Sequence, residues 1–538
     1  MIQSKIYRIG QNLRYVNIVA GLSTSQTRFH TNLATQVNTE STFQKKWQEA
    51  QPFKDIPNES VFRFIRNFLP GGDYHNLNYV HTLYKFHEKY GKICLMPSLF
   101  GRSPILLTFN PTDFETVFRN EGIWPQRPGF AALSHHREKH RPNFYQGADG
   151  LVSTNGQKWG KFRSTVNPVL MQPKNAKYYI HKMCKINLEF VERIKKIRDP
   201  QTLEVPANFE DEINRWALES VAVVALDKQL GLISNKRDDP AARRFLKIIT
   251  ELFTLAAELE FQPPVWKIIS TTKFKRTMQL LDEVQGITLN YVENALDSLE
   301  EDRKNGVVRM EHEKSVLEKL LRIDKKIAMV MAMDMLLAGV DTTTTIFTGI
   351  MLCLAKNPEK QQKLREELFR LMPEKDTPFT EDIRKELNYM RCCIKEALRL
   401  YPLGPGNTRT VQNDVVLSGY QVPMGTQVFM MAASVLKDEA NFSRASEFIP
   451  ERWIRQKKQD STECPASMKT TNPFIYLPFG FGPRVCIGKR VAELELELGV
   501  ARIIRNFKVE FNHSTENVFK PLIFNVPNIP LQFKFIDV

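Results

Sequence analysis

The sequence contains one cysteine-centred segment, FGFGPRVCIG, whose residue types suit a loop that presents a ligand. A lone cysteine is more often a small buried apolar residue than a ligand, so the flanking residues must carry the argument. Gly482 and Gly488 leave room for the backbone on both sides of Cys486, as a tight turn that presents sulfur to a large flat ligand needs. Arg484 adds a cation suited to a carboxylate. A helical pattern follows over 489–499, and the N-terminus of a helix favours a thiolate.

An acid stands beside hydroxyl groups inside an apolar helical pattern that runs from about 323 to 356. Asp341 is followed directly by Thr342, and Gly339 precedes them. One interpretation is a kinked helix, because Gly339 weakens the helix and Thr342 can donate its hydroxyl to a carbonyl one turn back. Helical spacing puts the following residues on one face: Met331, Met335, Ala338 and Thr342.

A third group consists of charged residues on a predicted helix over 391–400. Glu396 and Arg399 are three residues apart and can pair on one face, although such pairs are common on solvated helices. Arg391 and Lys395 are one turn apart, so their cations can point outwards while Glu396 points inwards. The group is a weak signal by itself.

The elements that must position these residues are mainly helices. Helical periodicity dominates from 158 to 299, with breaks at Asp239-Pro240 and Gln262-Pro263-Pro264, and it returns in the long helix that carries Asp341. Strand patterns occupy 101–109, 415–422 and 426–431. The pattern predicts an α+β chain, mainly helical in the middle, with a small strand-rich part at each end.

The composition excludes several classes of protein. The 538 residues are 42% hydrophobic and 25% charged, with a formal net charge of +15, which is typical of a large globular protein with acidic or membrane partners. Seven cysteines, two of them adjacent, do not suggest a disulfide framework. No nucleic-acid-binding signature accompanies the basic charge, so we expect no nucleic-acid partner. We expect residues 41–538 to form a single domain.

Residues 1–40 have the composition of a mitochondrial targeting presequence. Four basic residues, several Ser, Thr and Asn residues and no acid before Glu40 accompany an apolar stripe from Ile2 to Leu13. The apolar stretch at 15–22 is far too short to span a membrane. We therefore expect the matrix side of the inner mitochondrial membrane, and an apolar, basic region near 252–276 suits peripheral contact with that membrane.

The cysteine segment closely resembles the haem-binding loop of the cytochrome P450 family. Every fixed place of that loop is filled, by Phe479, Gly482, Arg484, Cys486 and Gly488. The resemblance extends over about residues 50–538 and is especially close to insect mitochondrial members of the family. It implies the cytochrome P450 fold, with a long central helix over the haem, and makes Cys486 the axial thiolate ligand of a haem b iron.

The same resemblance assigns roles to the other residues. Asp341 and Thr342 match the family's oxygen-activation motif, in which they would bind the oxygen and deliver protons. The segment at 448–453 matches a second motif, which would join Glu396, Arg399 and Arg452 in a charge network that braces the haem loop. The residues that would hold the haem carboxylates are Trp159, Arg163, Arg409 and Arg484.

Electrons must come from another protein, because no GxGxxG follows a strand and the length leaves no room for a flavin or nicotinamide domain. The mitochondrial branch of the family takes electrons from NADPH through a ferredoxin reductase and a 2Fe-2S ferredoxin. The resemblance implies that this acidic ferredoxin docks on Arg391, Lys395 and Arg490.

The expected reaction is insertion of one atom of O₂ into an apolar small molecule, with detoxification of foreign compounds favoured. Hydroxylation of an endogenous, ecdysteroid-type steroid stays open, as do a non-catalytic haem sensor and an oxygen-independent isomerase. The segments expected to line the substrate pocket are 128–151, 252–269, the helix face of 331–342, 403–408 and 524–526.

A histidine cluster at 134–140 has the spacing of a metal site in His136 and His140. The zinc-protease motif requires Glu after the first His, and Arg137 occupies that place. We therefore predict a polar surface loop.

Overall fold

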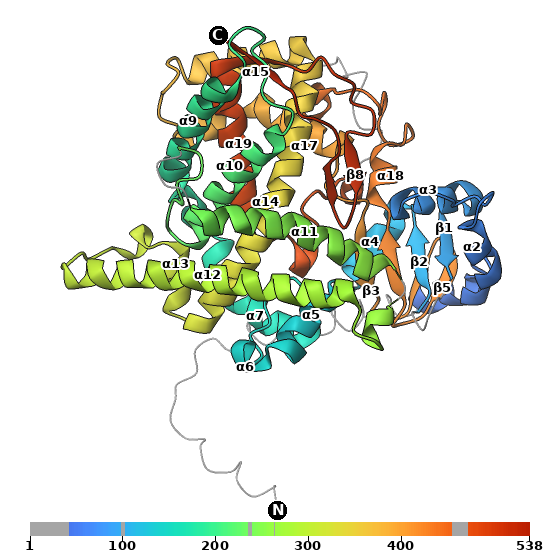
Figure 1. The fold of residues 1–538 in the computed structure, drawn as a ribbon. Coiled ribbons are helices and arrows are strands. Elements are labelled where there is room, and N and C mark those ends of the chain that lie inside the picture. Colours follow the sequence, from blue (N-terminus) through green and yellow to red (C-terminus); the bar gives the residue numbers. More distant parts are fainter. Residues whose placement is uncertain (1–41, 98–102, 235–238, 263, 455–471) are drawn as a thin grey trace, which may run out of the picture.

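The computed structural model describes residues 42–97, 103–234, 239–262, 264–454 and 472–538 (Figure 1). The predicted presequence, residues 1–40, lies outside this part of the chain. The helices, in chain order, are α2 (Val61–Asn67), α3 (Tyr79–Tyr90), α4 (Pro111–Arg119), α5 (Ala131–His135), α6 (Pro142–Tyr145), α7 (Gly156–Leu170), α8 (Pro173–Lys177), α9 (Ile180–Ile197), α10 (Phe209–Ala225), α11 (Pro240–Phe261), α12 (Thr272–Lys304), α13 (Val316–Leu321), α14 (Lys325–Lys356), α15 (Pro358–Leu371), α16 (Glu381–Glu386), α17 (Asn388–Leu400), α18 (Ala432–Leu436) and α19 (Lys489–Asn506).

The strands form one four-stranded sheet and three two-stranded pairs. Their bounds are β1 (Ile93–Met96), β2 (Ile105–Thr108), β3 (Asn407–Thr410), β4 (Val415–Leu417), β5 (Tyr420–Val422), β6 (Gln427–Met430), β7 (Phe507–Glu510), β8 (Phe519–Pro521), β9 (Asn525–Pro527) and β10 (Lys534–Asp537). The large sheet has the order β1-β2-β6-β3, with β2 and β6 parallel. Strands from the two halves of the chain therefore share one sheet, on the side of the molecule next to α2 and α3 (Figure 1).

Helix α14 runs through the middle of the helical part (Figure 1). Asp324 caps its N-terminus, accepting a hydrogen bond from the backbone N–H of Ile327 at 2.8 Å. Among the described helices it alone is long and apolar enough to cross a membrane, but 72% of its most apolar window is buried inside the protein. This burial explains why the helix is apolar on nearly every side, as expected of a core helix.

Small residues and aromatic rings bring the neighbouring helices close to α14. The Trp216 ring of α10 lies 4.6 Å from the Phe347 ring of α14. A Cβ at Gly499 of α19 would come within 2.7 Å of Trp216, so a larger residue would separate these helices. Thr344 donates a hydrogen bond across the same interface to Asn214 at 2.7 Å. Packing of α10 and α19 thus fixes the central helix from two sides.

The predicted fold class is confirmed: the protein is mainly α with a small β part. The helix expected over 323–356 is α14, and the one expected over 489–499 continues to Asn506. The breaks predicted near Pro240 and Gln262 fall at the two ends of α11.

Candidate functional site

The Cys486 loop connects a 3-10 turn, Gly482–Arg484, to the N-terminus of α19. Gly482 has φ +70°, and a Cβ there would collide with the Glu121 carboxylate, so only glycine fits. The Cys486 N–H donates to the Phe479 carbonyl at 2.9 Å, which closes the loop. Burial raises the pKa of the Cys486 thiol, yet the residue keeps accessible surface. The sulfur therefore faces an internal space.

Four guanidinium groups converge behind this loop. Burial and the neighbouring cations of Arg127 and Arg409 lower the pKa of Arg484 to about 8, and burial together with Arg409 lowers that of Arg127 to about 10. Glu121 forms a buried ion pair with Arg409. Arg484 Nη1 and Arg163 Nε are buried with no hydrogen-bond partner among the described residues. The cluster is therefore short of anionic partners.

Trp159 and the backbone hold the unpaired guanidinium groups in place. The Arg484 guanidinium lies 4.1 Å from the centre of the Trp159 ring and donates to the Thr154 carbonyl at 2.8 Å. Arg163 Nη2 donates to the Val485 carbonyl at 2.8 Å. Their remaining N–H groups are fixed in direction before any ligand binds, which favours bidentate contact with carboxylates.

The acid and the hydroxyl predicted on the long helix are adjacent on α14. Thr342 donates to the Ala338 carbonyl at 2.6 Å, the back-bond expected from the sequence, and the helix is continuous through Gly339. A Cβ at Gly339 would lie 2.7 Å from Val221, so this glycine serves the contact with α10. Burial raises the pKa of Asp341 to about 7. This carboxyl group can therefore exist in both protonation states near neutral pH.

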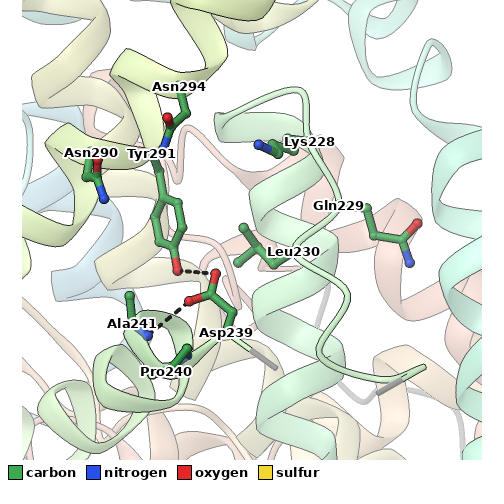
Figure 2. A pocket seen from close by; sticks show the side chains of 9 residues that line it. All are labelled: Lys228, Gln229, Leu230, Asp239, Pro240, Ala241, Asn290, Tyr291 and Asn294. Carbon is green, nitrogen blue, oxygen red and sulfur yellow. Dashed lines mark hydrogen bonds between the residues drawn. The ribbon is translucent and has the colours of Figure 1, made fainter. Parts of the chain in front are cut away.

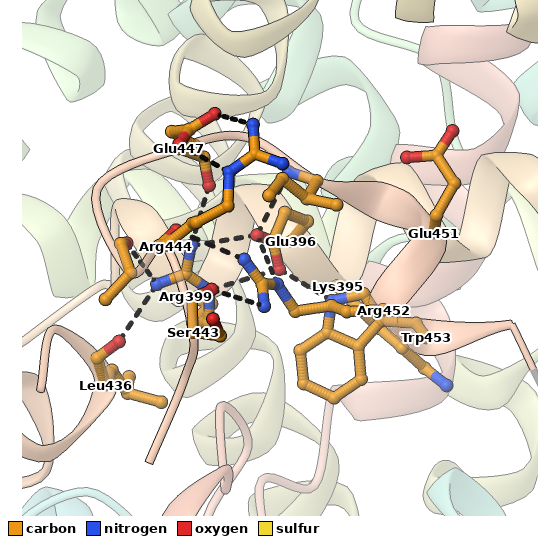
Figure 3. A network of polar contacts seen from close by, with 12 residues as sticks. Lys395, Glu396, Arg399, Leu436, Ser443, Arg444, Glu447, Glu451, Arg452 and Trp453 are labelled. Atoms are coloured by element: carbon orange, nitrogen blue, oxygen red, sulfur yellow. Dashed lines mark hydrogen bonds and ion pairs between the residues drawn. The ribbon is translucent and has the colours of Figure 1, made fainter. Parts of the chain in front are cut away.

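Glu396 is the centre of a buried charge network (Figure 3). Its carboxylate accepts from Arg399 Nη2 and Arg452 Nε, both at 2.8 Å, and from Trp453 Nε1 at 2.8 Å. Arg399 also donates to the backbone carbonyls of Leu436, Ala445 and Glu447. The side chains of Glu396, Arg399 and Arg452 have no exposed area, so the pairing satisfies charges that would otherwise be costly to bury.

An apolar pocket borders α14 at Ala338. Its lining consists of Phe130, Ala132, Leu133, Val152, Leu252, Phe253, Ala256, Leu259, Glu260, Thr277, Leu281, Leu337, Ala338 and Phe524. Four of the five segments expected to line the substrate pocket contribute to it. The segment 403–408 contributes no residue to this lining, and α12 contributes two residues that the sequence did not indicate.

A family model described as Cytochrome P450 matches residues 62–535. The chain belongs to the cytochrome P450 family. It is 56% identical over 496 residues to Cytochrome P450 CYP12A2 of Musca domestica, which covers 92% of each chain. It is 51% identical over 533 residues, 99% of each chain, to Probable cytochrome P450 12a5, mitochondrial, of Drosophila melanogaster. It is also 45% identical to Probable cytochrome P450 12c1, mitochondrial, of the same fly, over 92% of this chain and 94% of that one.

These relatives confirm the predicted family, its insect mitochondrial branch and the mitochondrial location. This cytochrome P450 is a monooxygenase, and its cofactor is a haem whose iron has a thiolate ligand. The residues at the site fit that group. Two buried guanidinium N–H groups lack partners within the described part of the chain and could donate to the haem carboxylates.

Several residues of the site of this cytochrome P450 were not found from the sequence. Arg127 joins the guanidinium cluster, and Glu121 is its acid. Glu495 of α19 accepts from Thr343, next to Thr342, at 3.3 Å, and burial keeps its pKa far above the usual range. The available signal for Arg127 was its place in the segment Trp-Pro-Gln-Arg-Pro at 124–128. No local sequence pattern distinguishes Glu121 or Glu495.

The predicted docking cations differ in availability. Lys395 is exposed and points away from Glu396 (Figure 3). Arg391 is tied to Glu497 at 3.2 Å, and Arg490 donates to the Met171 carbonyl at 2.7 Å. Two of the three side chains thus have hydrogen-bond or ion-pair partners within the protein, while Lys395 Nζ lies 5.8 Å from the centre of the Trp453 ring.

The prediction of a polar surface loop at the histidine cluster is wrong. His135 ends α5, and 136–140 form a π-helical turn in which His136 is buried. His136 Nε2 lies 2.9 Å from the Asp282 carboxylate of α12, which also pairs with Arg141. Within the described residues no group of three potential ligands could hold a metal ion. Packing against α12 therefore explains these histidines.

A second hollow is polar and lies where α12 meets the start of α11 (Figure 2). Its main contact is the Tyr291 hydroxyl, which donates to Asp239 at 2.9 Å, while Asp239 also caps α11. Asn290 and Asn294 on its rim are exposed. The hollow contains no residue of the predicted site.

Proposed function

We propose that this mitochondrial monooxygenase oxidises foreign apolar compounds, with Cys486 as the axial ligand of its haem iron. The apolar pocket beside Ala338 is the observation that carries the substrate class. The lining has two polar side chains, Thr277 and Glu260, which also bond within the protein, to the Lys273 carbonyl at 2.9 Å and the Ala131 N–H at 3.3 Å. A substrate with many hydroxyl groups would find few hydrogen-bond partners in such a lining, which argues against a highly hydroxylated steroid.

The haem, when bound, would activate O₂, and one atom of that O₂ is the atom inserted. The chain positions the substrate and delivers protons. Asp341 can hold a proton near neutral pH because burial raises its pKa to about 7, and the hydroxyl of Thr342, the next residue along α14, is proposed to pass that proton on. Gly339 and Ala338 keep the helix surface small beside these two residues.

The haem carboxylates are proposed to bind Arg484, Arg163, Arg409 and Trp159. Arg127 is an addition to this set. Their support is the surplus of buried positive charge and the unpartnered N–H groups. Phe479, Gly482 and Gly488 shape the loop around Cys486. The Glu396–Arg399–Arg452 network acts at a distance, by fixing the backbone segments that run on to this loop.

Electrons are proposed to come from NADPH through a ferredoxin reductase and a 2Fe-2S ferredoxin. Lys395 is the exposed cation of the predicted docking set, and Arg391 and Arg490 contribute their charge while paired within the protein. An acidic ferredoxin would be attracted to these cations, with an association rate that falls as salt is added.

Peripheral contact with the inner membrane is proposed on a separate surface. Phe62 on α2 is 79% exposed, and Ile268 and Ile269 after α11 are 89% and 65% exposed. Tyr79 and Phe261 stack with ring centres 4.1 Å apart and join the α2–α3 region to the end of α11. Exposed apolar side chains of this size mark a contact with lipid or protein.

The test is turnover by the haem-loaded enzyme with NADPH, ferredoxin reductase and ferredoxin. A panel of aromatic and alicyclic foreign compounds is compared with an ecdysteroid-type steroid by product analysis. We expect products from several panel members and little from the steroid. Selective turnover of the steroid would overturn the substrate class, and product formation without any reductant would overturn the monooxygenase reaction.

A further inference from the structure

Glu121 is a buried acid beside the Cys486 loop. Its side chain is 2% exposed and follows α4 in the chain. One carboxylate oxygen, Oε2, accepts from Arg409 Nε, which is buried to the same degree. The other oxygen, Oε1, is buried with no hydrogen-bond partner among the described residues, and it lies against Gly482 of the loop. Glu121 therefore joins one arginine of the site to the backbone that carries Cys486.

Neutral partners hold most of the guanidinium cluster, which consists of Arg127, Arg163, Arg409 and Arg484. All but Arg409 donate to backbone carbonyl groups at 2.7–2.8 Å and have no ion-pair partner within the described part of the chain. Asp334 also acts on Arg127, but it pairs with Arg137 at 2.6 Å. Glu121 is therefore the acid that offsets the charge of this cluster.

The net charge of the site depends on Glu121. Burial raises the pKa of Glu121, while Arg409 and Arg484 oppose that rise and favour the carboxylate. With the two haem carboxylates bound, four guanidinium groups and one ionised Glu121 leave a single positive charge, and loss of Glu121 would leave two. Reduction adds a negative charge to the haem, so buried cations favour the reduced form and a buried acid favours the oxidised form.

We propose that Glu121 sets the reduction potential of the haem, by holding Arg409 in place and by offsetting one positive charge of the guanidinium cluster. This inference rests on the proposed role of these arginines at the haem carboxylates. Glu121 acts through Arg409 and through the loop at Gly482, so it is a positioning residue. Its ionised carboxylate lowers the potential and stabilises the oxidised resting enzyme.

The test is an anaerobic potentiometric titration of the substrate-free holoenzyme, followed by the Soret band of its haem-bound fraction. Glu121→Gln keeps the size of the side chain and removes its charge. The equilibrium constant for reduction should rise about tenfold, which is about 59 mV for one electron. Nearby charges shift ionisation equilibria by about ten- to a thousandfold, and we take the lower end because Glu121 acts through Arg409. Glu121→Asp keeps the charge and should keep a potential close to that of the wild type.

A compensating variant separates charge from structure. Glu121→Gln combined with Arg127→Gln removes one negative and one positive charge, so its potential should return close to the wild-type value. A purely structural role predicts the opposite, because two substitutions in one cluster disturb it more than one does.

Two controls make the result specific to the buried charge. Glu115 on α4 pairs with Arg119 and is 36% exposed, so Glu115→Gln removes a screened surface charge and should leave the potential unchanged. The reduced, carbon-monoxide-bound spectrum of every variant should keep its strongly red-shifted Soret band, which shows that the thiolate ligand is retained.

The outcomes separate this inference from the assignment of the arginines. Arg163→Gln should lower both the haem content and the potential, and no change in either would overturn the assignment of the cluster to the haem carboxylates. A shifted potential in Arg163→Gln with an unchanged potential in Glu121→Gln would overturn the role of Glu121 alone. If Glu121→Gln retains too little haem to titrate, the double variant should recover both haem and potential, and failure to recover them would overturn the inference.

Discussion

Replacement of Asp341 by Asn tests whether the buried carboxyl group on α14 delivers protons. The pKa of Asp341 is raised to about 7 by burial, against an ordinary value of 3.8. A group with that pKa is about 91% protonated at pH 6 and about 9% protonated at pH 8. If the protonated form is the donor, turnover of the wild type should fall about tenfold as pH rises from 6 to 8. Asn keeps the size of the side chain and cannot supply this proton.

The assay follows product and NADPH consumption together between pH 6 and pH 8, at saturating ferredoxin. We expect the Asn variant to form product about a hundredfold more slowly than the wild type at pH 6, the lower end of the range for general acid catalysis, with a flat pH profile. Asp341→Glu should retain part of the pH dependence. The reduced, carbon-monoxide-bound spectrum of both variants should be normal. A wild-type pH profile preserved in Asp341→Asn would refute the reasoning, because the titrating group would then lie elsewhere.

Three further predictions concern the haem ligand, the charge network and a buried ion pair between α14 and the turn after α5. Cys486→Ser should abolish the strongly red-shifted Soret band of the reduced, carbon-monoxide-bound protein, and its retention would exclude Cys486 as the ligand. Glu396→Ala should lower the free energy of unfolding by about 3–5 kcal/mol, because it leaves two buried guanidinium groups without their acid. Glu396→Gln should lower it by less. Equal melting temperatures for Glu396→Ala and the wild type would contradict this. Asp334→Asn removes the charge that pairs with Arg137 at 2.6 Å and leaves a buried guanidinium without its acid, so it should lower the melting temperature. An unchanged melting temperature would contradict this.

Local patterns in the sequence were sufficient for the central helix and for the Cys486 loop. The apolar run of α14 and the glycines around Cys486 are each recognisable within one segment. The mixed sheet was not predictable in this way. Its strand β2 pairs with β6, more than three hundred residues later, and no periodicity in either strand specifies that partner.

The same limit explains which site residues were missed. Arg484 and Arg163 belong to motifs, whereas Glu121 becomes functional only because the fold seats its carboxylate between Arg409 and Gly482. The buried state of His136 was missed for a related reason. Its neighbours in sequence are polar, and only the approach of Asp282 on α12 makes burial possible.

The segment 121–127 runs beside the Cys486 loop, because Arg484 Nε donates to the Pro125 carbonyl at 3.1 Å. Its inward residues, Glu121 and Arg127, belong to the guanidinium cluster, while Ile123 and Trp124 face the surface. Glu121 pairs with Arg409 within the protein, so it limits the repulsion among the buried guanidinium groups. We therefore expect Glu121→Gln to lower the haem content of the purified protein, whereas Ile123→Ser, at a side chain that is 74% exposed, should leave it unchanged. Loss of haem in Ile123→Ser, measured from the ratio of Soret to protein absorbance, would contradict this division of the segment.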